Sequence, residues 1–279
     1  MGETYADLYP SHIRAMVLDG VLNPTLDGVD FATQQAAGLD QQLSAFLTWC
    51  AARTCSWHPG GDLHAAYDSL MSRIGTSRIP GVGSRTVGPG EAFLGVVQNL
   101  FAPEEWPSLA EALSKASAGD GSLLLKAFDT YAGRAPDGSY SNGIEANNAI
   151  ECLDGPWPHD PTVVMQAAAK AKQQAPEFGV DNIYSGLICS FWPVPPTGRP
   201  HPISAAGSPP IVVVGTTGDP ITPYPLAQAV AAQLASARLI TRQGNGHTAY
   251  RSSQCVRNAV DAYFISSSVP AAGLNCPTP

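Results

Sequence analysis

Two residues near the C-terminal end of the chain, Asp219 and His247, have side chains that together can move a proton. Asp219 lies in the segment IVVVGTTGDP, whose apolar, β-branched residues 211–214 predict a buried parallel strand. His247 lies in the loop QGNGHTAY, which follows a second short strand expected at residues 238–241. Open α/β sheets place their chemistry at the carboxyl ends of strands. A carboxylate there can hold an imidazole in one tautomer, so that the other ring nitrogen takes a proton.

The order and interval of the two residues narrow the chemistry. A helix expected at about 224–234, with Thr222 as N-cap and Pro223 at its first position, separates the strands, and 247 − 219 = 28 residues separate the side chains. The last two members of a Ser-Asp-His triad follow this order in α/β-hydrolases. Each residue alone has a simpler explanation, because Gly-Asp-Pro is a turn signal and a loop histidine is commonly a surface residue. The joint pattern favours a catalytic pair.

The composition argues against several classes of function. The chain has 279 residues, 44% of them hydrophobic, which suits one large α/β domain or a core with an insertion. The net charge of −8, with Lys+Arg at only 15, argues against nucleic acid and anionic membranes as partners. No apolar run approaches a membrane span, and the N-terminal MGETYADLYP lacks the basic and apolar regions of a signal peptide. We expect neither a metal site nor a cofactor.

The expected elements predict a core that is divided by a helical insertion. A strand at residues 13–18 ends in Asp19-Gly20, and no convincing strand follows between Asp30 and Cys189. That interval carries apolar residues at the helical period instead. Helices are expected from Phe31 and near 62–74, 91–101, 108–116, 122–131, 144–152 and 161–174. We therefore predict core residues 1–29, a helical cap or lid at 30–190, and core residues 191–279 that carry Asp219 and His247.

The six cysteines are an even number and show no zinc-finger spacing. Two pairs are close in sequence and lie at element ends, which favours disulfides and hence an exported protein. The pairs that we propose are Cys50–Cys55, Cys255–Cys276 and Cys152–Cys189. The alternative is six reduced, buried cysteines in a cytosolic protein, and six cysteines allow 15 connectivities.

Several longer phrases point to one family. In chain order they are YADLYPSHIRAMVLDGVLNP, FLTWCAARTC, AIECLDGPWP, IVVVGTTGDPITPYPLAQAVAAQL and GNGHTAY. Together they resemble the secreted bacterial tripeptidyl aminopeptidases, which are α/β-hydrolases related to prolyl iminopeptidases. The resemblance implies a serine exopeptidase that releases tripeptides from free N-termini through an acyl-enzyme, with Asp219 and His247 in its triad. It also implies disulfides and a secreted or cell-envelope location.

The chain departs from the family at the nucleophile. The family's elbow, G-x-S-x-G, lies shortly before the helix that continues into YADLYP, and no serine of this chain lies in such a motif. The resemblance therefore predicts an incomplete α/β-hydrolase core that lacks the serine, the first strands and the oxyanion-hole loop. Four explanations fit the missing upstream part. The gene could be truncated, its start misassigned, or the sequence that of a clone, or this chain could be a second half that works with a separate first half. In each case we expect no peptidase turnover from this chain alone.

An incomplete core also predicts low stability. Only about three strands are expected, near Ile13, Ile211 and Arg238. The first of them would lack its upstream neighbour and expose a hydrophobic edge. We therefore expect the isolated chain to aggregate or to depend on a partner, which would be its own N-terminal half.

An exopeptidase for free N-termini must also neutralise the substrate's ammonium group. Candidate carboxylates in the cap are Glu151 and Asp154, with Glu145 nearby, although a solvated acidic helix end explains them equally well. Trp192 and Trp157 are candidate walls of the substrate cleft, and cap-to-core packing is the simpler explanation for both. The expected substrate is a peptide with a free N-terminus.

Two other functions fit the same sequence. An esterase or lipase-like hydrolase uses the same scaffold, because a fold does not fix a substrate. A non-catalytic binding remnant would keep the cap surface without the chemistry.

Overall fold

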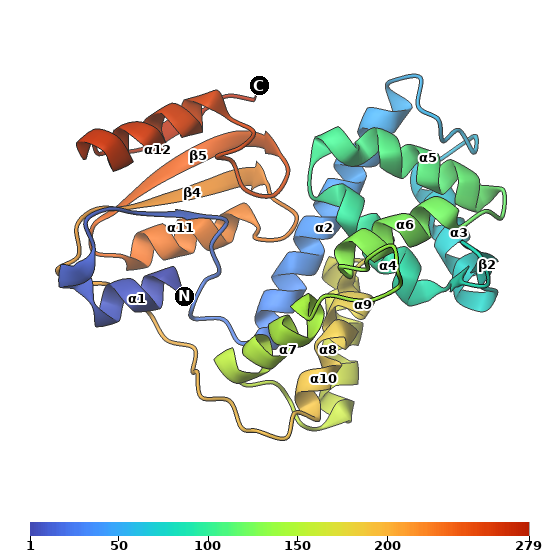
Figure 1. The fold of residues 1–279 in the computed structure, drawn as a ribbon, viewed down its shortest axis with the longest axis horizontal. Coiled ribbons are helices and arrows are strands. Elements are labelled where there is room, and N and C mark those ends of the chain that lie inside the picture. Colours follow the sequence, from blue (N-terminus) through green and yellow to red (C-terminus); the bar gives the residue numbers. More distant parts are fainter. Residues whose placement is uncertain (279) are drawn as a thin grey trace.

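The computed structural model describes residues 1–278, in which four strands form one parallel sheet (Figure 1). The strands are β1 (Met16–Asp19), β4 (Ile211–Gly218), β5 (Ala237–Asn245) and β6 (Leu274–Cys276), and they lie in the order β1-β4-β5-β6. β4 pairs with β1 on one side and with β5 on the other. Because all pairs are parallel, the carboxyl ends of β1, β4 and β5 lie at the same edge of the sheet.

Alternate residues of β4 face two opposite layers of helices. Ile211 and Val213 pack against α1 (Gly2–Leu8) and α11 (Tyr224–Gln233), whereas Val212 and Val214 pack against α12 (Gln254–Ser266). Figure 1 shows α11 and α12 on the two sides of the sheet. A strand that is covered on both faces needs apolar side chains at every position, which explains the unbroken run IVVV.

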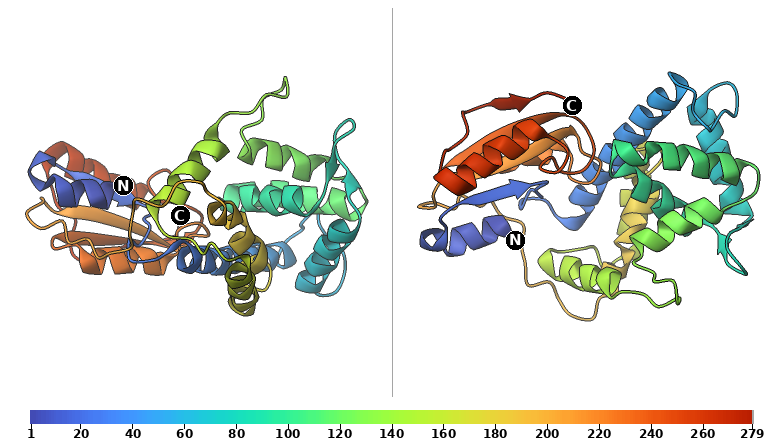
Figure 2. Two further views of the ribbon diagram at one scale, coloured as in Figure 1. Left: turned by 90° about the horizontal axis from the view of Figure 1, so that it is seen from below. Right: turned by 45° about the horizontal axis from the view of Figure 1, so that its top comes forward.

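A helical part, defined here as α2 to α10, lies beside the sheet and is inserted between β1 and β4 (Figures 1 and 2). Asp27, Asp62 and Asp160 cap three of its helices by accepting hydrogen bonds from first-turn N–H groups. Its helices are α2 (Gly28–Ala51), α3 (Leu63–Thr76), α4 (Pro89–Leu100), α5 (Trp106–Ser117), α6 (Ser122–Tyr131), α7 (Gly143–Asp154), α8 (Pro161–Gln174), α9 (Gly179–Ser185) and α10 (Leu187–Ser190). Short 3₁₀ helices are η1 (Pro10–His12) and η2 (Pro103–Glu105). The boundaries at residues 29/30 and 190/191 stay predictions.

The long helix α2 contributes to both apolar clusters of the helical part. One cluster joins α2 to α3, α4, α5 and α6 around Phe46 and Leu113, and the other joins α2 to α8 and α9 around Ala32 and Ile183. Asp40 of α2 also accepts the backbone N–H of Phe178 at 3.0 Å, which fixes the turn before α9. The insertion is therefore built along one helix that begins shortly after β1.

The structure corrects three sequence predictions. The interval between Asp30 and Cys189 does contain strands, because β2 (Ile79–Pro80) and β3 (Thr86–Val87) pair as a small antiparallel hairpin. The sheet has a fourth strand, β6, which is too short to show a period in sequence. Helix α11 begins at Tyr224 with Pro223 as N-cap, not with Thr222. The hydroxyl of Thr222 donates to Asp219 instead of capping the helix.

All three proposed disulfides are present. Cys50–Cys55 closes the loop after α2, and Cys152–Cys189 joins α7 to α10. Cys255–Cys276 joins the start of α12 to β6, which fastens the short edge strand to the helical layer above it. Residues 1–278 contain no free cysteine.

A carboxyl group at the junction between the two clusters has an unusual titration. Glu177 precedes Phe178, whose side chain is buried. The pKa of Glu177 is raised from 4.5 to about 7. Burial is the largest cause, followed by the hydrogen bond and charge of Asp68 and then by the charge of Asp40, while the positive charge of Lys172 lowers the pKa. The folded chain therefore holds a proton on Glu177 at a pH at which the unfolded chain has released it.

We predict that Glu177→Gln stabilises the chain more at pH 8 than at pH 5. The stability that comes from the bound proton is fully present below pH 4.5 and is lost as the pH rises towards about 7, whereas glutamine stays neutral throughout. Thermal unfolding of both proteins at the two pH values measures the difference. Glu145→Gln is the control, because Glu145 is exposed. An equal effect of Glu177→Gln at both pH values would contradict the prediction.

Candidate active site

The carboxylate of Asp219 is buried just beyond the end of β4, with its side chain only 1% exposed. Its Oδ1 accepts the backbone N–H groups of Ile221 at 2.9 Å and Thr222 at 2.8 Å, which makes a tight turn after the strand. Its Oδ2 accepts the Thr222 hydroxyl at 3.1 Å and the backbone N–H of Thr248 at 3.1 Å. A buried carboxylate needs such donors to replace water, and here they come from two different loops.

The imidazole of His247 completes the set of donors around this carboxylate. Its Nδ1 lies 3.0 Å from each carboxylate oxygen of Asp219. An ionised carboxylate can only accept hydrogen bonds, so Nδ1 carries the proton of the neutral ring and Nε2 is left as an acceptor. The His247 side chain is 24% exposed, so that the ring is accessible while its partner is buried. This arrangement suits a general base that is held in one orientation.

Glycines allow the neighbouring loops to approach the ring. Gly246 has φ +109°, and its N–H donates to the carbonyl of Gly218 at 3.0 Å, which joins the loop after β5 to the end of β4. Gly20 has φ +78°, and a Cβ there would lie 3.0 Å from His247 Cε1 and 3.0 Å from Thr222 Oγ1. A larger residue at position 20 would therefore press on the imidazole as well as strain the backbone.

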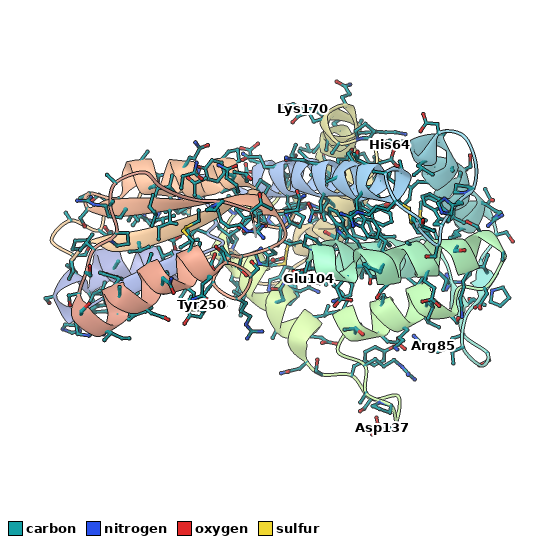
Figure 3. All side chains as sticks on the ribbon, turned by 90° about the horizontal axis from the view of Figure 1, so that it is seen from above. His64, Arg85, Glu104, Asp137, Lys170 and Tyr250 are labelled. Carbon is teal, nitrogen blue, oxygen red and sulfur yellow. A yellow bond between two sulfur atoms is a disulfide. The ribbon has the colours of Figure 1, made fainter. Side chains whose placement is uncertain are left out.

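A second carboxylate, Asp19 at the end of β1, holds the loop from the other side. It accepts the backbone N–H groups of Ala249 at 3.0 Å and Tyr250 at 2.9 Å. Burial raises the pKa of Asp19, the hydrogen bonds from these two N–H groups lower it, and the nearby charge of Asp219 raises it again. Figure 3 shows Tyr250 beside α12, on the side of the molecule that carries the sheet. The place of Asp19 at the end of a strand was the signal available in the sequence, and no role was predicted for it there.

The helical part touches the Asp219 turn directly through α2. A Cβ on Gly38 would lie 3.1 Å from the carbonyl oxygen of Asp219 and 3.0 Å from that of Pro220, so only glycine fits without a shift. One turn earlier, Gln35 donates its side-chain N–H to the carbonyl of Ile221 at 3.0 Å. The turn that carries the carboxylate is thus supported by the insertion as well as by the sheet.

The proposed substrate carboxylates lie on α7, away from these contacts. Partial desolvation raises the pKa of Glu151, a hydrogen bond from Asn147 opposes this, and the charge of Asp154 adds to it. Asp154 is exposed at the last turn of α7, where Thr197 and Gly198 of the returning chain donate to the carbonyl of Leu153. Among residues 1–278, no hydrogen bond or ion pair joins Glu151 or Asp154 to His247.

The two tryptophans differ in their surroundings. Trp157 fills the space left by Gly28 of α2 and Gly186, where an added Cβ would meet its ring at about 2.5 Å, so it packs the helical part together. Trp192 is half-buried and follows α10 in the chain that returns to β4. Trp157 therefore packs within the helical part and not between cap and core, whereas the role of Trp192 as a cleft wall stays a prediction. No group of His, Cys, Asp or Glu suited to a metal ion occurs within the described residues.

Comparison with known proteins finds similarity to hydrolases. Residues 173–276 match the family model described as TAP-like protein. The chain is 35% identical to Carboxylesterase B of Mycobacterium tuberculosis over 280 residues, which cover 96% of this chain and 53% of that protein. It is 33% identical to the Serine protease Hip1 of Mycobacterium tuberculosis over 290 residues, covering 99% and 55%, and 27% identical to the Tripeptidyl aminopeptidase of Streptomyces lividans over 286 residues, covering 99% and 52%. The chain thus spans about half the length of the curated relatives it matches.

We predict that Asp19→Ala loosens the loop that carries His247. The change removes the acceptor of two backbone N–H groups. Water can replace it at the exposed N–H of Tyr250, whereas the part-buried N–H of Ala249 loses up to roughly 1–3 kcal/mol. Urea unfolding should show this loss, and hydrogen exchange should show faster exchange at residues 247–250. Asp261→Ala is the matched control, since Asp261 accepts only the exposed hydroxyl of Tyr250. Unchanged exchange in Asp19→Ala would count against a supporting role.

Proposed function

This chain belongs to the TAP-like family of α/β-hydrolases, and we propose that it supplies the acid and the base of a serine hydrolase triad. The observation that carries the proposal is the buried Asp219 with His247 Nδ1 at 3.0 Å from both of its oxygens. The parallel sheet, with both residues beyond the carboxyl ends of neighbouring strands, supports it. The names of the relatives, a serine protease and a carboxylesterase among them, support the reaction class.

In the proposed reaction, His247 acts through Nε2. It takes the proton of a serine hydroxyl as the oxygen attacks the scissile carbonyl, and then gives that proton to the leaving amine. Water hydrolyses the acyl-enzyme by the same route, with His247 again as base. Asp219 keeps the proton of the neutral ring on Nδ1 and stabilises the imidazolium that forms in each step.

We place the nucleophile on a partner segment, the N-terminal half of the complete enzyme, since no serine of this sequence lies in G-x-S-x-G. The open side of the sheet supports such a partner. β1 pairs only with β4, so its other edge is free among the described strands. Next to it, α1 and the residue after it expose Tyr5, Leu8 and Tyr9, with exposed fractions of 44%, 64% and 49%. A partner strand would satisfy the edge and cover this apolar surface.

We propose peptides with a free N-terminus as substrates, released as tripeptides. The pair Glu151 and Asp154 would neutralise the substrate's ammonium, and Trp192 would line the cleft. The raised pKa of Glu151 supports an ion pair with the substrate's ammonium. Burial disfavours the charged form of this carboxyl, and a neighbouring cation would stabilise that form. The relative named Tripeptidyl aminopeptidase supports the substrate class.

An ester substrate is the second candidate. It rests on the 35% identity to the protein named Carboxylesterase B, which is higher than the 27% identity to the aminopeptidase. The same triad serves both reactions, so the choice depends on the binding groups. Comparing tripeptidyl and acyl-ester chromogenic substrates on the restored enzyme separates the two, and Glu151→Gln should impair only the peptidase.

We further propose a secreted or cell-envelope location. The three disulfides support it, because such bonds persist in oxidising compartments. Within residues 1–278, none of the helices has the length and apolar character needed to cross a lipid bilayer.

We predict that this chain alone has no peptidase turnover and that adding an N-terminal half restores it. The half can come from one of the relatives, in cis or as a separate chain, and release of a tripeptidyl chromophore is the measurement. In the restored enzyme, His247→Ala should abolish turnover, and Asp219→Asn should lower kcat by roughly 10⁴-fold because the tautomer is no longer held. His64→Ala, at an exposed histidine of α3, is the control.

Two outcomes would contradict this proposal. One is turnover by the purified 279-residue chain that a serine-directed phosphonate abolishes, which would place the nucleophile inside this sequence. The other is a restored enzyme that is indifferent to His247→Ala. If no N-terminal half restores turnover while the chain still binds peptides, the binding remnant is the better description.

A further inference from the structure

The backbone of His247 is held by the end of a helix in the insertion. The N–H of His247 donates to the carbonyl oxygen of Phe101 at 2.7 Å, and Phe101 directly follows the last residue of α4. The ring of Phe101 also faces the imidazole, with 5.8 Å between centroids and an angle of 79° between planes. This edge-to-face packing covers one side of the imidazole with an apolar group.

The approach is close because the loop has a glycine at the point of contact. A Cβ on Gly246 would lie 3.3 Å from the carbonyl oxygen of Phe101, 3.1 Å from Pro103 Cδ and 3.6 Å from the Cα of Ala102. The backbones of the two segments therefore lie directly against each other. In Figure 3, Glu104, which follows this segment, lies where the helical part meets the part that contains the sheet.

The end of α4 is itself fixed from α2. Gln42 is buried, and its side-chain N–H donates to the carbonyl oxygen of Leu100 at 3.2 Å. Its Oε1 has no hydrogen-bond partner within the described chain, so the bond to Leu100 is the one hydrogen bond that this side chain makes there. Gln42 lies one turn beyond Gly38, which packs on the Asp219 turn. Helix α2 thus contacts the turn that carries Asp219 directly and the loop that carries His247 through α4.

We infer that Gln42 and Phe101 are positioning residues for His247, so that the insertion sets the geometry of the base. The inference rests on the function proposed above for His247. Gln42 holds the carbonyl of Leu100 at the end of α4, the carbonyl of the next residue, Phe101, holds the backbone of His247, and the Phe101 ring shields the imidazole. Together they keep Nδ1 on Asp219 and leave Nε2 directed at the reacting hydroxyl.

Gln42→Leu in the 279-residue chain tests the first link without any turnover. The change removes the bond to Leu100 and keeps a buried side chain of similar size, so the Phe101 carbonyl should lose its fixed position. Exchange of the His247 amide, read at single-residue resolution, should become up to about tenfold faster, as expected for one weakened hydrogen bond. Asn99→Leu is the matched control, because this buried amide bonds only to Gly95 within α4. Equal acceleration in both variants, or none in Gln42→Leu, would overturn the inference.

Phe101→Leu tests the second link and leaves the backbone bond in place. The rate at which diethyl pyrocarbonate modifies His247, followed by mass spectrometry, should rise several-fold, because the ring loses the edge-to-face cover of Phe101. Phe93→Leu is the control, because Phe93 lies within α4 and packs against Phe178 instead. In the restored enzyme, Phe101→Leu should lower kcat with little change in KM. An unchanged rate of His247 modification in Phe101→Leu would refute the role, whether or not the chain proves to be a hydrolase.

Discussion

The structure around the site depends on the burial of the Asp219 carboxylate. An anion that is removed from water requires donors in fixed directions, and Asp219 finds them on two loops that follow different strands. Satisfying this one group therefore fixes the separation of the loops after β4 and β5. The imidazole of His247 is the last donor, so its orientation follows from the need to satisfy the carboxylate.

The loop of His247 lies between two carboxylates. Asp219 binds the ring and the N–H of Thr248, and Asp19 binds the two N–H groups that follow. Burial raises the pKa of Asp19 most, the two backbone donors lower it, and the negative charge of Asp219 raises it further. The loop is thus held at successive residues, which is what a base requires when it must act at a fixed distance.

The helical insertion is part of the same framework. Gln35 and Gly38 of α2 contact the turn that carries Asp219, and Gln42 contacts the end of α4 that holds His247. A helix with residues at 35, 38 and 42 presents them on one face, so a single rigid element spans both loops.

The central strand, the helical periods of the insertion, and the order and interval of Asp219 and His247 could be read from the sequence. The three cysteine pairs were proposed from it and are confirmed by the structure, since six cysteines alone allow 15 connectivities. These features depend on residue types and on short spacings. The sequence did not predict strand β6, the β2–β3 hairpin or the hydrogen bond from Thr222 to Asp219, because each of them involves only a few residues. The residues that support His247, Asp19 and Phe101, come to it only when the chain is folded. Asp19 is 230 residues from Ala249, and Phe101 is far from His247. In both contacts the donor is a backbone N–H group, which almost every residue has. The sequence therefore does not show which N–H groups will be bound in the folded chain.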